Sequence, residues 1–142
     1  MPTRLLIAAV LTLCTVISGA AVQAPPAKAV STASGVFTSA QASRGEQTYM
    51  SICGSCHPRG SYTTNAFRQK WDGAPLSELF GLISQTMPKD APGTLTPDEY
   101  IDVVAYLLRL NGSPAGKADL RTELKTLKRI RISFAGTKAK DR

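Results

Sequence analysis

The sequence predicts an all-α domain built from three main helices joined by long loops. Each predicted helix begins with an N-terminal signal, and two of them carry apolar residues at spacings of three and four; no stretch between them alternates apolar and polar residues as a strand does. The chain has 142 residues, of which 43% are hydrophobic and 19% charged, a composition typical of one globular domain. A disordered chain and a large two-domain enzyme are thereby excluded.

The N-terminal segment predicts a secretory signal peptide. Residues 5–17 are apolar, follow a single Arg and are too short to span a bilayer comfortably. A small-x-small pattern ends at Ala24, but Pro25 disfavours cleavage directly after it, so cleavage a few residues earlier and an uncleaved anchor are alternatives. We expect residues 1–24 to be removed and the mature protein to be periplasmic, with its two cysteines in an oxidising compartment.

The first predicted helix follows a flexible leader. Residues 25–36 are rich in Pro, Ala and Ser and lack apolar periodicity, so the domain is predicted to begin at Phe37. Thr38 and Gln41 have the spacing of a capping box, and this predicts a helix that runs towards Ile52.

The second and third helices are predicted from proline and apolar periodicity. Pro75 suits a first helical position, and the apolar stripe after it comprises Leu76, Leu79, Phe80 and Ile83. The third helix has Thr96 as N-cap, Pro97 in first position, Glu99 to close a capping box, and an end at Asn111-Gly112. Its predicted buried stripe comprises Tyr100, Val103, Val104, Leu107 and Leu108.

Three short helices share little apolar surface. Domains of about 80 residues are marginally stable unless something adds to the core. We therefore expect a bound cofactor to supply apolar bulk.

The pentapeptide Cys53-Gly54-Ser55-Cys56-His57 is the most informative motif. In C-x-x-C-H, two thiols form thioether bonds to the haem vinyl groups and the adjoining imidazole reaches the iron. A thioredoxin-like site needs a βαβ setting, a zinc site needs two further soft ligands, and a plain disulfide leaves His57, the only histidine, unexplained. The motif predicts one covalently attached haem c with its iron.

With this motif the sequence resembles the class I cytochromes c over about residues 37–114. Gly45 and Tyr49 resemble the family's small and aromatic pair in the N-terminal helix, and Val103 and Tyr106 resemble the facing pair on the C-terminal helix. Residues 95–108 resemble the last helix of the family throughout. The resemblance implies a cytochrome c fold in which these two helices cross, which would explain a glycine within the first helix.

Met87 is the predicted sixth ligand of the iron. Met1 leaves with the leader, and Met50 lies too close in sequence to His57 to reach the opposite haem face. The resemblance also places the ligand methionine in a loop before the last helix, where Met87 lies and where Pro88 restricts the backbone. The alternative for a lone methionine is core filling.

Three further side chains are candidates for contact with the haem propionates. Trp71 could donate its indole N–H to a propionate, or simply fill the core. Arg59 and Arg68 are the other candidates, with ordinary solvated surface positions as the alternative.

With both axial positions filled, the sequence predicts an electron carrier and not an enzyme. The expected partners are a periplasmic dehydrogenase as electron donor and an oxidase or another cytochrome as acceptor; nucleic acid is not expected. The alternative is a haem c subunit of a periplasmic oxidoreductase complex, a dehydrogenase or a sulfur-compound oxidation system. A haem sensor is less favoured because no signalling domain is recognisable.

The net charge of +7 is concentrated at the C-terminus. Residues 117–142 hold nine Lys or Arg and three acidic residues, whereas residues 25–116 hold seven of each. Leu120, Leu124 and Leu127 follow a helical spacing, so one interpretation of this basic C-terminal extension is a solvated helix packed on a haem domain of residues 37–116. The other is a docking extension for an acidic redox partner or for peripheral contact with an anionic membrane.

Overall fold

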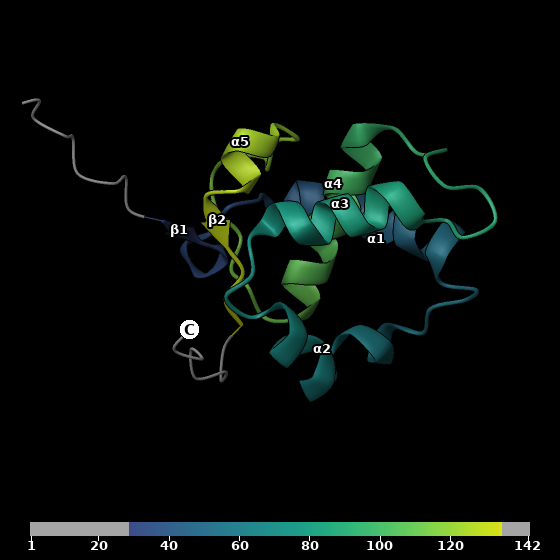
Figure 1. Cartoon of the computed structure of the whole chain (residues 1–142), viewed down its shortest axis with the longest axis horizontal. Coiled ribbons are helices and arrows are strands. Elements are labelled where there is room, and N and C mark those ends of the chain that lie inside the picture. Colours follow the sequence, from purple (N-terminus) through teal and green to yellow (C-terminus); the bar gives the residue numbers. More distant parts are fainter. Residues whose placement is uncertain (1–28, 135–142) are drawn as a thin grey trace, which may run out of the picture.

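The computed structural model describes residues 29–134, so the predicted signal peptide lies outside the described residues. The fold is mostly helical, as predicted, with four main helices: α1 (Ser39–Thr48), α2 (Asn65–Trp71), α3 (Leu76–Thr86) and α4 (Pro97–Leu110) (Figure 1). A short α5 (Leu124–Leu127) and two strands, β1 (Val30–Ser31) and β2 (Ile130–Arg131), lie at one end of the molecule. Within residues 29–134, no helix combines the length and the apolar character needed to cross a bilayer.

Helix α4 is the central element. Its capping box forms as predicted: the Glu99 N–H donates to Thr96 Oγ1 at 3.2 Å, and the Thr96 N–H donates to Glu99 Oε2 at 2.8 Å. The Thr96 N–H and the Thr96 hydroxyl both donate to Glu99 Oε2 and hold the pKa of the Glu99 carboxyl below its ordinary value. Every residue from 100 to 108 is buried, so the helix is covered on all sides and not only along the predicted stripe. It ends at Leu110, with Asn111 as C-cap before a left-handed Gly112 (φ 86°).

Helix α1 crosses α4 at Gly45, where the two backbones touch. A Cβ added to Gly45 would lie 1.8 Å from the carbonyl oxygen of Asp102 and 2.8 Å from the nitrogen of Val103. Beyond the crossing the helix continues as a π-helical turn (Tyr49–Cys53), and the Tyr49 and Tyr106 rings pack with centroids 5.2 Å apart. The facing pairs expected from the cytochrome c resemblance are therefore present.

Two details of the helices differ from the predictions. Pro75 is the N-cap of α3 and not its first residue. Helix α2 was not predicted, because seven residues are too few to show apolar periodicity; its one local signal is Thr64, whose Oγ1 accepts a hydrogen bond from the Phe67 N–H at 3.1 Å.

The end of the predicted flexible leader is ordered. Strands β1 and β2 pair in parallel, with Val30 opposite Ile130. Thr32 is buried, and its Oγ1 donates to the carbonyl of Ser133 at 3.1 Å and accepts from the Ser133 N–H at 2.9 Å. The expectation of a flexible segment up to residue 36 is therefore wrong for residues 30–36, because pairing with a segment about 100 residues later satisfies their polar groups.

Residues 117–134, here called the C-terminal strap, wrap across the end of the helical core. The predicted helix through Leu120 and Leu124 does not form, and only α5 is helical. The buried apolar residues of the strap are Leu120, Leu127, Ile130, Ile132 and Phe134, all in one cluster with residues of α3 and α4. The strap thus enlarges the apolar core, which would be small if only the three predicted helices contributed to it.

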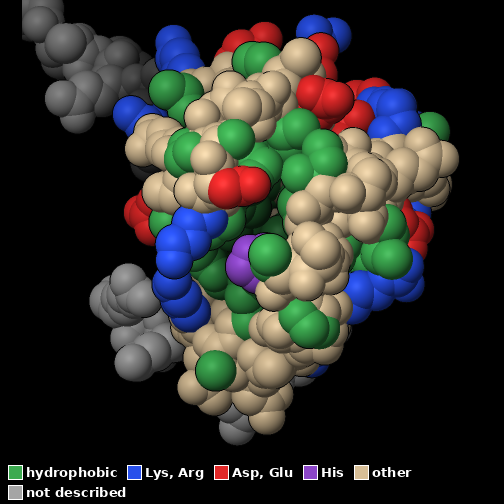
Figure 2. Space-filling model, turned by 90° about the vertical axis from the view of Figure 1, so that its right-hand side faces the viewer, with side chains coloured by type: hydrophobic (Ala, Val, Ile, Leu, Met, Phe, Trp, Pro, Cys, Tyr) green, Lys and Arg blue, Asp and Glu red, His purple; other side chains and the backbone are tan. Residues whose placement is uncertain are grey.

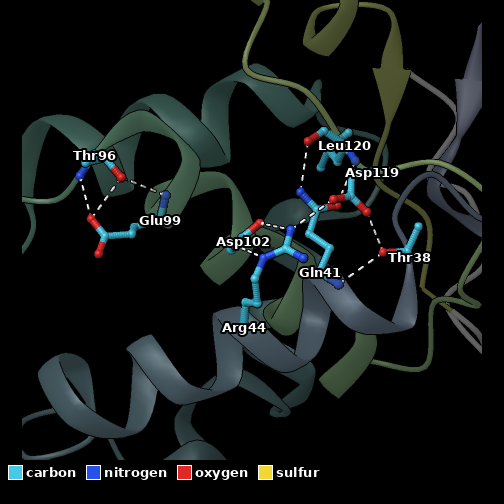
Figure 3. A network of polar contacts seen from close by, with 8 residues as sticks. All are labelled: Thr38, Gln41, Arg44, Thr96, Glu99, Asp102, Asp119 and Leu120. Carbon is cyan, nitrogen blue, oxygen red and sulfur yellow. Dashed lines mark hydrogen bonds and ion pairs between the residues drawn. The ribbon is translucent and has the colours of Figure 1, made fainter.

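Polar contacts attach the strap to α1 (Figure 3). The buried Gln41 side chain donates to the carbonyl of Leu120 at 2.9 Å and accepts from its N–H at 2.7 Å, so the amide expected to complete a capping box with Thr38 binds the strap instead. Arg44 bridges Asp102 of α4 (2.8 Å) and Asp119 of the strap (2.9 Å), and Thr38 and Arg44 together hold the pKa of Asp119 below its ordinary value.

We predict that Gly45→Ala lowers the free energy of unfolding by about 3 kcal/mol or more, because the added methyl group meets backbone that cannot move aside without separating α1 from α4. The measurement is denaturant unfolding followed by circular dichroism. The matched control is Gly81→Ala in α3, where the added Cβ meets only Gln85 Nε2 at 3.9 Å. This control should be neutral or stabilising by up to about 1 kcal/mol; equal losses in the two variants would contradict the role given to the crossing.

Candidate functional site

A cavity of about 720 Å³ opens on the face of the molecule shown in Figure 2. Its walls come from the π-helical turn, α2, α3, the segment 87–90 and two α4 residues, Val103 and Leu107. In Figure 2 the histidine (purple) lies at the edge of a hollow lined by hydrophobic side chains (green). The size and apolar lining suit a large, flat, mostly apolar ligand.

The Cys53–His57 motif forms a tight turn on this cavity. The N–H groups of Cys56 and His57 both donate to the carbonyl of Cys53, at 3.2 and 2.9 Å. This turn brings both thiols and the imidazole to the same cavity, where they are among the lining residues. The cysteines are free thiols, and burial raises the pKa of the Cys53 thiol.

Tyr49 connects this turn to the helix crossing. Its hydroxyl donates a hydrogen bond to the carbonyl of His57, the residue that ends the motif. The ring is 1% exposed, and burial raises the pKa of the phenol to about 12, so it stays a neutral donor at physiological pH. Tyr62 flanks the imidazole with ring centroids 5.6 Å apart.

Met87 lines the same cavity as His57, from the segment that follows α3. Tyr100 of α4 holds this segment at two points: its hydroxyl donates to the carbonyl of Met87 at 2.6 Å and accepts from the Gly93 N–H at 3.0 Å. The sequence predicted Tyr100 only as a core residue, since nothing local distinguishes its hydroxyl role. Met50 lies away from the cavity and is 50% exposed, with its sulfur 3.2 Å from an Arg59 nitrogen.

Only one of the three candidates for contact with the haem propionates lines the cavity. Trp71 lines the cavity, whereas Arg59 is paired with Glu46 at 3.3 Å and Arg68 donates to Asn111 Oδ1 at 3.2 Å. Neither arginine lines the cavity, and each side chain pairs with a protein partner elsewhere, so their contact with a propionate stays a prediction. Lys70 and Lys89, which no local sequence pattern distinguishes, are lining residues instead.

The donor set fits a covalently attached haem. Two thiols for the vinyl groups, an imidazole and a thioether share one cavity with apolar walls. Among residues 29–134 no group of three or more His, Cys, Asp or Glu side chains comes together as a separate metal site.

Comparison with known proteins agrees with this geometry. A family model described as cytochrome C oxidase, cbb3-type, subunit III, matches residues 40–107, from α1 to α4. Residues 40–107 form a monohaem c-type cytochrome domain. The matched region contains the whole motif and Met87, whereas β1 and the C-terminal strap lie outside it. No curated protein and no solved structure matches the chain significantly.

Domains of this kind share general properties. Cytochrome c domains bind haem covalently, typically carry electrons and do not act as enzymes, and generally work outside the cytoplasm. The single C-x-x-C-H motif of the chain corresponds to one haem.

We predict that Tyr100→Phe lowers the free energy of unfolding by about 1–3 kcal/mol, because the Met87 carbonyl and the Gly93 N–H both lose their partner. Hydrogen exchange at the Gly93 amide should be faster in Tyr100→Phe than in the wild-type protein. Tyr106→Phe is the matched control: the Tyr106 hydroxyl is buried and has no hydrogen-bond partner within the described part of the chain, so its removal should be neutral or stabilising. Unchanged exchange at Gly93 in Tyr100→Phe would contradict the anchoring role.

Proposed function

We propose that the protein is a periplasmic monohaem cytochrome c that transfers single electrons between redox partners. The supporting observation is that Cys53, Cys56, His57 and Met87 all line one cavity. The predicted signal peptide supports export.

Each residue has a proposed role at this site. Cys53 and Cys56 would hold the haem through two thioether bonds, and His57 and Met87 would bind its iron. When bound, the haem supplies one-electron chemistry between ferric and ferrous iron. A thioether opposite an imidazole favours the ferrous state and gives a higher potential than two imidazoles.

The surrounding residues orient these ligands and exclude water. Tyr49 fixes the carbonyl of His57, and Tyr100 fixes the carbonyl of Met87, so both ligand segments are held from the α1–α4 pair. Leu79, Val103 and Leu107 present apolar side chains to the cavity. Trp71 is the proposed N–H donor to a propionate.

The rim of the cavity is the proposed contact surface for redox partners. Ile52 and Leu82 line the cavity and are 38% and 44% exposed, which is high for large apolar side chains. Lys70 and Lys89 lie on the same cavity and favour partners with acidic surfaces. The matching family implies a cbb3-type oxidase as electron acceptor, and a periplasmic dehydrogenase is the proposed donor.

A second candidate is a haem c subunit of a periplasmic oxidoreductase complex. The description of the family model, which names an oxidase subunit, favours it. Co-purification of the protein with a stable membrane or dehydrogenase complex would distinguish this subunit from a free carrier.

We predict that Met87→Ala abolishes the weak absorption band at the red end of the visible spectrum of the oxidised protein, because this band requires sulfur on ferric iron, and that it lowers the reduction potential. Absorption spectroscopy and redox titration are the measurements. Met50→Ala is the matched control and should leave the band and the potential unchanged, since Met50 is exposed outside the cavity. A band that survives in Met87→Ala would show that the ligand assignment is wrong.

We also predict that the ferrous protein does not bind carbon monoxide when exposed to it, because His57 and Met87 would both occupy the iron. The same exposure should convert Met87→Ala rapidly to the carbonyl form. Rapid carbon monoxide binding by the wild-type protein would favour ligand-binding or catalytic chemistry over electron transfer.

A further inference from the structure

The C-terminal strap carries a concentrated positive charge. Its 18 residues, 117–134, include six Lys or Arg and two acidic residues, a net charge of +4, whereas residues 29–116 hold six Lys or Arg and seven acidic residues. The six cations of the strap are Lys117, Arg121, Lys125, Lys128, Arg129 and Arg131, and all are exposed. The basic character of the described structure thus resides in one segment.

The charges of the strap are not neutralised within the domain. The ion pairs formed among residues 29–134 use Arg44, Arg59 and Arg109, and none of them uses a cation of the strap. The strap is also held firmly, because Leu127 and Ile132 are in the core and Gln41 binds Leu120 through two hydrogen bonds. It therefore displays its cations from a fixed backbone.

One large apolar side chain accompanies these cations. Leu124 is 55% exposed, the highest value among the exposed large hydrophobic residues of the described chain, and it directly precedes Lys125. An exposed apolar residue among lysines and arginines suits the interface of a lipid bilayer, where the leucine can enter the acyl region and the cations contact phosphate.

The strap lies away from the opening of the haem cavity. Elements α5 and β2 are at the end of the molecule where β1 begins (Figure 1), and the cavity opens on the face obtained by turning the molecule by 90° (Figure 2). No residue of the strap lines the cavity. A redox partner bound to the strap would therefore sit away from the cavity rim, whereas electron transfer requires close approach to it.

The chain also enters the domain beside the strap. Val30 pairs with Ile130 and Ser31 with Arg131, so the described part of the chain begins next to the cations Arg129 and Arg131 of the strap.

We propose that the C-terminal strap docks the domain on an anionic membrane surface and leaves the cavity rim free for redox partners. Binding of the strap to the membrane does not depend on the proposed function. Only the statement that the cavity rim stays free for redox partners rests on it. Lysine near an anionic bilayer strengthens binding about fivefold per residue at moderate salt, and the effect is lost as salt screens the charges.

The test measures co-sedimentation of the haem-loaded protein, recovered after export, with vesicles of phosphatidylcholine containing phosphatidylglycerol. Lys125→Gln/Lys128→Gln should lower the partition coefficient about 25-fold. Lys70→Gln/Lys89→Gln, which removes the same charge at the cavity, should lower it by less than about threefold. Binding of the wild-type protein should disappear on pure phosphatidylcholine and at high salt.

Three results would overturn the proposal: no binding of the wild-type protein to the anionic vesicles, equal losses in the two double variants, or slower electron transfer to a soluble acidic partner in Lys125→Gln/Lys128→Gln than in Lys70→Gln/Lys89→Gln. The last result would make the strap a protein-docking surface. Sedimentation needs no redox activity, and the absorption spectrum reports haem ligation separately, so failure of membrane docking is distinguishable from failure of the proposed function.

Discussion

The backbone contact between α1 and α4 at Gly45 is the constraint on which the rest of the structure depends. Because no Cβ separates Gly45 from the carbonyl of Asp102, the two helices approach closely enough for Tyr49 to pack on Tyr106. Tyr49 then reaches the carbonyl of His57. A larger residue at position 45 would move the entire Cys53–His57 turn away from α4, whose side chains form part of the cavity wall.

Helix α4 contacts the elements on both sides of the cavity, the Met87 segment and helix α1. Near its start Tyr100 holds the Met87 segment, in its middle Val103 and Leu107 face the cavity, and its contact with α1 positions the histidine side. The positions of Met87 and of the Cys53–His57 turn therefore both depend on one helix, whose residues 100–108 are all buried.

The C-terminal strap joins stability and surface charge in one segment. Its apolar residues alternate with cations near the end, so Ile130 and Ile132 enter the core while Arg131 faces solvent. Phe134 also packs near Phe67, with ring centroids 6.1 Å apart, and its N–H donates to Asp72 at 3.1 Å, so the strap supports the α2 side of the cavity. A segment that the family model does not cover thus contributes both to the core and to the basic surface.

The sequence by itself determined the features that depend on neighbours three or four residues apart: the capping box of α4, its end at Gly112, and the turn that places Cys53, Cys56 and His57 together. Tertiary structure decided which side chains meet at long range. The Thr32 hydroxyl binds Ser133, 101 residues later, and the Gln41 side chain binds Leu120 of the strap and not Thr38. Arg59 and Arg68 bind protein partners outside the cavity. Lys70 and Lys89 line the cavity. Local hydrogen bonding is encoded in the spacing of residue types, whereas the choice among distant partners depends on which surfaces the packed helices bring together.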